Sequence, residues 1–301
     1  MSKPIIVGYD PHRRAHGPVD LGAAMAKVTG APLIIACVQA RSPVLPISAG
    51  EELPYAIADR ELVEDCGPAM EEVDADMRAA GVPYECRGIA GTRAARALQA
   101  LAEEEDAGLV VIGWTRPEAA ERALGAATAA SLLHGAPCPV AVAPLSWASA
   151  RPFATVGCAW LDTDEGNEAL RSAHALARRA GATLHVLTVL RLGKGAKVSD
   201  EDRRRAEEDL RRAISPLAGD VAVEVHLFAG DPAEILVGAS SEIDVLVCGS
   251  RGYGPLRAVL LGSVSRRLVR EAQCPVIVLP RGVEASLEAL LAEAPGAATP
   301  A

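Results

Sequence analysis

The 301-residue sequence predicts an α/β protein made of two tandem doubly wound domains, each with a five-stranded parallel sheet. Three observations predict this fold: an internal repeat, apolar runs that alternate with helical stretches, and a low aromatic content. Half of the residues are hydrophobic, but only 3% are aromatic. The core must therefore consist mainly of Val, Leu, Ile and Ala, as in buried parallel strands covered by Ala-rich helices.

Segments of the first half of the chain recur, in the same order, in the second half. Each copy opens with an apolar run and an Ala-rich stretch that ends in Gly-Ala-x-Leu, and each closes with a Cys-Pro-Val run. The matching segments include 30–33 with 181–184, 109–113 with 245–249, and 136–142 with 272–278. This order indicates a duplication, so the same domain fold is expected twice.

Each half contains five short runs rich in Val, Ile and Leu, the composition of strands that are buried on both faces. Helical stretches join the first four strands of each half, and one of them begins with the N-cap signature Asp231-Pro232-Ala233-Glu234. The strands expected in the first half are 4–9, 32–38, 82–87, 109–113 and 140–143. Those expected in the second half are 155–159, 183–189, 221–227, 245–249 and 276–279.

The repeat also sets the expected boundaries. The first domain spans 1–146, a linker spans 147–152, and the second domain spans 153–282. The remaining tail, 283–301, is expected to be partly disordered, with one weak helical stretch. Strands 140–143 and 276–279 lie next to the domain ends, where an unpaired apolar edge is a liability. We therefore expect the halves to pair through these two strands about a pseudo-twofold axis.

Composition excludes several classes of protein. The net charge of −9 argues against a protein whose main partner is a nucleic acid or an anionic membrane. No apolar run approaches the roughly 20 residues that cross a bilayer. The seven cysteines are odd in number and far apart, which indicates buried free thiols in a reducing compartment and not a disulfide framework or metal cluster. A cytoplasmic protein is expected.

One segment has the residues and spacing of a phosphate-binding loop. Gly249-Ser250-Arg251-Gly252 is followed by nine residues and then by Gly262-Ser263-Val264-Ser265, between a buried strand and a helix. Glycines let backbone N–H groups approach an anion, and the helix adds unpaired N–H donors and the positive end of its dipole. With 27 glycines in the chain, a GxxG pair alone could mark a simple turn. The added Gly-Ser at this spacing favours a phosphate site.

This segment resembles the G-x2-G-x9-G-[ST] loop of ATP-binding universal stress proteins of the UspA-like type, and matches it without a gap. The runs 274–276 and 230–232 are also typical of that family. The resemblance covers nearly the whole chain twice. It implies the adenine nucleotide α-hydrolase-like fold with strand order 3-2-1-4-5. It also implies ATP or a related adenine nucleotide beyond the first and fourth strands, with any Mg²⁺ held mainly by the phosphates.

The family's binding residues can be carried over to the second half. The adenine is expected to meet the backbone of Val189. The family also places an aspartate after the first strand, where ungapped alignment of the repeats puts Leu161 opposite Asp10. Asp162 fills that role only if the turn shifts by one residue. The residues expected to wrap the ribose and phosphates are Gly249, Arg251, Gly252, Gly262, Ser263, Val264 and Ser265.

The loop of the first half is degraded, although Asp10 and Val38 are in place. Gly113 is followed by Trp114-Thr115-Arg116, so that Arg116 stands where the second glycine belongs. Ala126-Ala127 replaces the later Gly-Ser pair, and Gly125 is one place out of register. Side chains at these positions would keep the backbone away from a phosphate, so this pocket is expected to be empty or altered.

The other candidate sites are weaker. The sequence has no G-x-S-x-G elbow and no GxxxxGK[ST] loop, so no catalytic residue is assigned. Trp114 and Trp160 lie near strand ends, where packing explains them. The six histidines show no metal-ligand spacing and are expected to be isolated, so no metal site is predicted. They are His12, His16, His134, His174, His185 and His226.

Three functions remain open. The first is a stress-response regulator that binds ATP and assembles as a homo-oligomer, such as a homodimer, in addition to its internal domain pairing. The second is a nucleotide-independent scaffold that acts through partner contacts. The third, a slow ATPase, is disfavoured because the loop has no P-loop lysine, and the acids Asp244 and Glu271 are not obviously aimed at a γ-phosphate.

Overall fold

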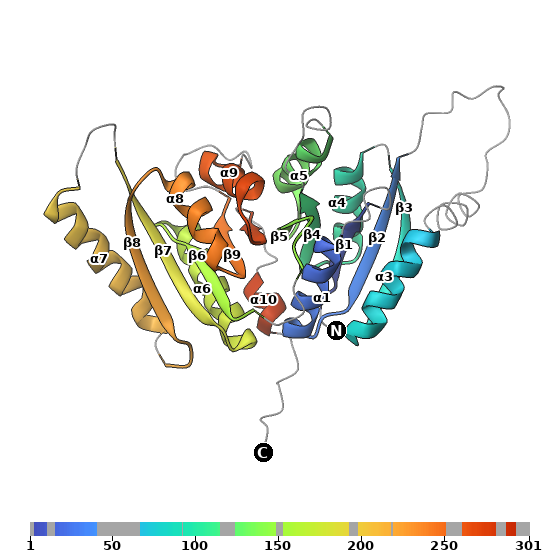
Figure 1. Ribbon diagram of the computed structural model, residues 1–301, viewed down its shortest axis with the longest axis horizontal. Coiled ribbons are helices and arrows are strands. Elements are labelled where there is room, and N and C mark those ends of the chain that lie inside the picture. The colour runs from blue at the N-terminus through green and yellow to red at the C-terminus, as the bar shows by residue number, and fades with distance from the viewer. Residues whose placement is uncertain are drawn as a thin grey trace, which may run out of the picture.

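The computed structural model describes residues 3–10, 16–40, 67–91, 93–114, 124–148, 153–192, 198–217, 219–250, 261–280 and 287–292. Its strands form a single ten-stranded sheet in the order β3-β2-β1-β4-β5-β10-β9-β6-β7-β8 (Figure 1). The strands of the first half are β1 Ile5–Tyr9, β2 Leu33–Ala40, β3 Tyr84–Gly91, β4 Leu109–Trp114 and β5 Val140–Pro144. Those of the second half are β6 Thr155–Ala159, β7 Thr183–Arg191, β8 Val223–Gly230, β9 Val245–Gly249 and β10 Val276–Leu279.

The strand order within each half is 3-2-1-4-5, and the ladders inside each half are parallel, as the sequence predicts. All ten predicted strands are present. The third strand of each half, β3 and β8, begins two residues later than expected and runs on to a glycine. For β3 the late start has a simple cause, because Pro83 has no backbone N–H to donate to a ladder.

The two halves join through β5 and β10, the only antiparallel ladder among the described strands. Val276 pairs with Val142, Ile277 with Ala141, and Val278 with Val140. Because the repeat makes Val140 equivalent to Val276 and Val142 to Val278, a local twofold axis passes through the Ala141–Ile277 pair. This confirms the predicted pairing, in which each apolar edge covers the other.

Helices cover both faces of the sheet (Figure 1). One core cluster includes Val7 and the residues that α1, α3, α6 and α7 bury; the other includes Ile6 and the buried residues of α4, α5, α8 and α9. Neighbouring strand residues thus serve opposite faces, as the period-two geometry of a strand requires. The helices are α1 Gly17–Thr29, α3 Gly67–Ala80, α4 Ala94–Glu104, α5 Leu124–Gly135, α6 Asp164–Ala180, α7 Asp200–Ile214, α8 Pro232–Ala239 and α9 Ser263–Glu271, with short 3-10 turns η1 Ser215–Leu217 and η2 Ser240–Glu242.

The helix start predicted at Asp231 is present. Its side chain accepts a hydrogen bond from the backbone N–H of Glu234 at 2.9 Å, and Pro232 is the first residue of α8.

A last helix, α10 (Leu287–Ala292), lies in the tail, where the sequence predicts only a weak helical stretch. Leu287, Leu290 and Leu291 are buried in the same cluster as residues of α1 and α6. Figure 1 shows α10 between the two halves, and its contacts reach both α6 and α1. The tail therefore adds apolar burial at the junction of the domains.

The cysteines differ in part from the expectation. Cys37 is disulfide-bonded, so the prediction of free thiols throughout is wrong for this residue. Disulfide formation depends on the distance between two Cα atoms in the fold, which sequence spacing does not reveal. Cys86 is an exposed free thiol, while Cys138, Cys158, Cys248 and Cys274 are free and buried.

Candidate functional site

The ends of the predicted loop meet at the carboxyl end of β9. The backbone N–H of Ser250 donates to the carbonyl of Leu279 on β10 at 3.0 Å, and that of Gly262 donates to the carbonyl of Ser250 at 2.7 Å. Residues 251–260 between them, including Arg251 and Gly252, lie outside the described residues. The chain thus leaves β9 and returns to the same point before α9 begins.

Ser265 holds α9 to this base. Its side chain is buried, and its Oγ donates to the carbonyl of Gly249 at 2.9 Å, with the carbonyl of Ser250 at 3.3 Å. The sequence suggests this hydroxyl as a phosphate contact. In the structure its proton is directed at the backbone of the loop base, so Ser265 fixes the start of the loop relative to the helix.

The N-terminus of α9 lies at the base of this loop. Gly262 precedes the helix with an extended backbone and provides no side-chain cap, and Ser263 is the exposed first residue of the helix. Val264 is partly buried against the core. The first turn has no acidic residue, and an anion near it would interact favourably with its N–H groups and the positive end of the helix dipole.

Arg266 is a cation at this site that sequence reasoning missed. Its guanidinium donates to the carbonyl of Leu261, immediately before Gly262, at 3.4 Å, and its residue is exposed. The signal was its position three residues after Ser263, which places both on one side of a helix.

Val189 lies near the carboxyl end of β7, on the side of the strand that faces β6. The N–H of Trp160 donates to the carbonyl of Leu187 at 2.9 Å, so the backbone groups of Leu187 face β6. Val189, two residues further along β7, faces the same side. The last residue of β6 is Ala159, so Val189 presents its backbone at the carboxyl end of that strand, where α/β proteins bind ligands.

Strand register fixes which residue of the second half replaces Asp10. Ile5 pairs with Leu33 and Leu109, while Val156 makes the equivalent pairs with Leu184 and Val245. Counting on from Ile5 and Val156, Leu161 occupies the position of Asp10.

Asp162, one residue later, is exposed and lines a cavity of about 330 Å³ with residues of α6, α7 and η1, on the face of the sheet opposite α9. The structure does not bring its side chain together with the base of the loop.

An acid that the sequence analysis overlooked lies beside the loop base. A Cβ built on Gly249 would be 3.2 Å from the Cβ of Glu165, in the first turn of α6. Asp244 is at the other end of β9, where its carboxylate accepts hydrogen bonds from the backbone of Ala154 and Thr155. Glu271 forms an ion pair with Arg267 at 2.9 Å.

The equivalent region of the first half is built differently. A Cβ on Gly113 would be 2.3 Å from Leu145 Cδ2 and 2.7 Å from Pro18 Cγ, so side chains pack directly on this glycine. Trp114 is buried, and its indole N–H donates to the carbonyl of Arg270 in the second half at 3.1 Å. Residues 115–123, which include Thr115 and Arg116, lie outside the described residues.

The later glycine-serine position differs too. Helix α5 already begins at Leu124, so Ala126 and Ala127 lie inside a helix, whereas Gly262 precedes one.

The expectation that the histidines are isolated is wrong for His185 and His226. They lie on the neighbouring strands β7 and β8, and His185 Nδ1 is 3.1 Å from His226 Nε2. The sequence spacing of 41 residues hides this contact, which the pairing of β7 with β8 creates.

Comparison with known proteins identifies the family. The model of the universal stress protein family matches residues 1–144 and 153–280. The chain belongs to the universal stress protein family. Universal stress protein Rv2319c of Mycobacterium tuberculosis (strain ATCC 25618 / H37Rv) is 24% identical over 292 residues, which cover 92% of this chain and 99% of the relative.

Shorter relatives match one half only. A universal stress protein of Thermus aquaticus is 32% identical over 135 residues, covering 42% of this chain and 98% of the relative. Among solved structures, a universal stress protein from Archaeoglobus fulgidus superposes with a TM-score of 0.68 at 19% identity, covering 94% of this chain and 100% of that one. This likeness confirms the tandem fold.

Within the parts of this universal stress protein that the structure describes, no helix combines the length and the apolar character that crossing a membrane requires.

Proposed function

We propose that this universal stress protein is a regulator that binds ATP or a related adenine nucleotide in its second half, with little or no hydrolysis. One observation carries the proposal. The Gly262–Ser250 hydrogen bond closes a loop whose exit coincides with the start of α9, and that helix has no side-chain cap and no acid in its first turn. A phosphate at this point would meet backbone N–H groups and the positive end of the helix dipole.

The proposed contacts combine the family resemblance with the positions of the described residues. Gly249, Arg251, Gly252, Gly262 and Ser263 would surround the phosphates, with Arg266 as an added cation. Val189 would meet the adenine through its backbone. Val264 and Ser265 would hold α9 against the sheet. Asp162 would contribute least, because its side chain lines the cavity between α6 and α7.

Slow hydrolysis is expected from the chemistry of the site. Fast phosphoryl transfer needs cations on the γ-phosphate and a residue that orients the attacking water. Backbone amides and serine hydroxyls stabilise the ground state as well as the transition state, which gives affinity without acceleration. Any Mg²⁺ would be held mainly by the phosphates.

The test is calorimetric titration of the nucleotide-free chain with ATP. We expect one nucleotide per chain, and we expect Gly252→Val to remove binding because a branched side chain would fill the space of the phosphate. The matched control is Arg116→Val at the equivalent position of the first half, which should bind as the unmodified chain does. Undiminished affinity in Gly252→Val would overturn the site, and no binding by the unmodified chain would favour the scaffold function.

Hydrolysis is tested separately, by steady-state phosphate release. Ordinary enzymes turn over at about 1–1,000 per second, and we expect a rate far below this range. A rate near one per second that disappears in Ser263→Ala would show that the protein is an enzyme.

A further inference from the structure

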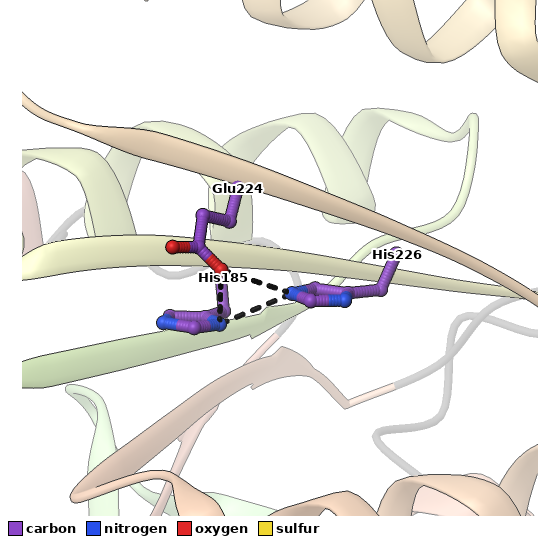
Figure 2. Close-up of side chains that lie close together, drawn as sticks. All are labelled: His185, Glu224 and His226. Atoms are coloured by element: carbon purple, nitrogen blue, oxygen red, sulfur yellow. Dashed lines mark hydrogen bonds and ion pairs between the residues drawn. The ribbon is translucent and has the colours of Figure 1, made fainter.

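Three side chains with metal-binding atoms converge on the edge of the second half (Figure 2). His185 lies on β7, and its register partner on the edge strand β8 is Glu224. His226 follows two residues later on β8, and therefore projects from the same face as Glu224. His185 Nδ1 lies 3.1 Å from His226 Nε2, and Glu224 Oε2 lies 3.7 Å from the first nitrogen and 3.9 Å from the second.

These distances match the spacing of ligands around one small cation. Bonds of roughly 2.0–2.1 Å in a tetrahedral arrangement place ligand atoms about 3.3–3.4 Å apart. The three separations in the structure lie on both sides of that value, so small side-chain rotations would bring all three atoms onto one ion. Figure 2 shows the carboxylate of Glu224 beside the gap between the two rings.

The surroundings hold the rings in place and leave the group accessible. The ring of His226 lies parallel to that of Phe228, within 7°, at a centroid distance of 6.1 Å. Gly157 faces His185 on β6, and the side chains of Ile243 and Leu246 fill the space over this glycine. The side chain of Glu224 is 60% exposed, and those of His185 and His226 are 20% and 33% exposed. An ion could enter from the side of Glu224.

In the first half, an arginine neutralises the charge of the glutamate that is equivalent to Glu224. Strand register makes Glu85 and Arg87 equivalent to Glu224 and His226, and Ile34 equivalent to His185. Arg87 Nε donates to Glu85 Oε1 at 2.6 Å, so the guanidinium supplies the positive charge. The second half replaces that guanidinium with imidazole and the neighbouring isoleucine with a second imidazole. Both changes replace side chains that cannot bind a cation with side chains that can.

We infer that His185, Glu224 and His226 form a binding site for a divalent transition-metal cation of the Zn²⁺ class, with water completing the coordination. Two imidazole nitrogens favour such an ion over Ca²⁺ or Mg²⁺, which prefer oxygen ligands. The site is separate from the nucleotide loop, because His185 precedes Val189 by four residues of β7, about 13 Å along a strand.

The experiment titrates the full-length chain, freed of nucleotide and metal, with Co²⁺ and then Zn²⁺. We expect one Co²⁺ per chain with the visible absorption of a histidine-ligated site, displaced by Zn²⁺. The principal variant is His226→Arg, which copies the first half and should pair with Glu224, so that the fold is kept. Loss of a residue that only hydrogen-bonds to a metal ligand lowers metal affinity by roughly 10- to 100-fold. His226→Arg removes a ligand itself, so its metal affinity should fall by more than this.

Two further variants make the test specific. Glu224→Gln, on an exposed side chain, should weaken binding without changing the thermal midpoint of the metal-free chain. His134→Ala, a histidine of the first half, should bind metal as the unmodified chain does. Gly252→Val should also retain metal binding, which separates this site from the nucleotide proposal. Unchanged Co²⁺ affinity in His226→Arg, or no binding by the unmodified chain, would overturn the inference.

Discussion

The two halves of this protein share a strand order and a closing Cys-Pro-Val strand, yet they use the end of the fourth strand differently. In the second half, Gly249 is followed by the small, buried Ser250, whose carbonyl accepts the N–H that closes the loop. In the first half, Gly113 is followed by Trp114, whose indole reaches α9 of the other half. One copy of the position begins the loop that we propose binds the nucleotide, and the other supports the joint between domains.

After a duplication, the two copies of one position can meet two different structural requirements. A loop that closes around an anion needs small residues, since side chains keep the backbone away from the ligand. A joint between domains benefits from a large aromatic side chain that buries apolar area and ends in a hydrogen-bond donor. Trp114 meets the second requirement, and under the proposed function Ser250 meets the first on the equivalent strand.

The largest expected effect is on the joint. Trp114→Ala should lower the free energy of unfolding by about 3–5 kcal/mol, because a buried aromatic side chain is lost and a cavity remains. Urea denaturation of the nucleotide-free chain measures this change. Trp114→Phe, which keeps most of the ring volume but leaves the Arg270 carbonyl without its donor, should cost only about 1–3 kcal/mol. Equal stability of all three chains would show that the indole does not contribute to the joint.

The next effect sharpens the contrast between the loops. Ser263→Asp places a negative charge in the first turn of α9, which favours the helix but repels a phosphate. At 4 Å such repulsion amounts to about 1–4 kcal/mol, so ATP affinity should fall by roughly 5- to 1,000-fold while thermal stability is kept or raised. The control is Ala127→Asp at the equivalent position of α5, which should leave affinity unchanged. Calorimetric titration measures the ATP affinity of both variants. An equal loss of affinity in both would contradict the assignment of the nucleotide site to the second half.

The smallest effect concerns thiol reactivity, for which we expect no difference between the halves. Cys138 and Cys274 are equivalent, and burial raises the pKa of each thiol to about 12. Because a raised pKa lowers the thiolate fraction at any lower pH, both should resist iodoacetamide equally at pH 8 and react only after unfolding. Peptide mapping by mass spectrometry checks this. Selective labelling of one of them in the native chain would show that the two Cys-Pro-Val strands are not packed alike.

Much of the fold follows from the sequence alone. The Val-, Ile- and Leu-rich runs determine the ten strands, since a strand buried on both faces needs a continuous apolar run. The repeat determines that the halves share a topology. The apolar edges of 140–143 and 276–279 determine that these strands pair, because each edge needs a partner. The spacing of Gly249, Gly252 and Gly262 predicts a phosphate loop, and the structure describes its two ends, where Gly262 donates a hydrogen bond to Ser250.

Only the tertiary structure decided the rest, because it depends on which distant residues become neighbours. Register decided between the two residues that the sequence offers at the position of Asp10, in favour of Leu161 over Asp162. Packing turned the weak helix of the tail into a buried part of the domain junction. The alternation Glu224-x-His226 was visible as one face of a strand, but nothing local joins it to His185. The ladder between β7 and β8 brings these side chains together, since strand pairing joins residues that the sequence keeps far apart.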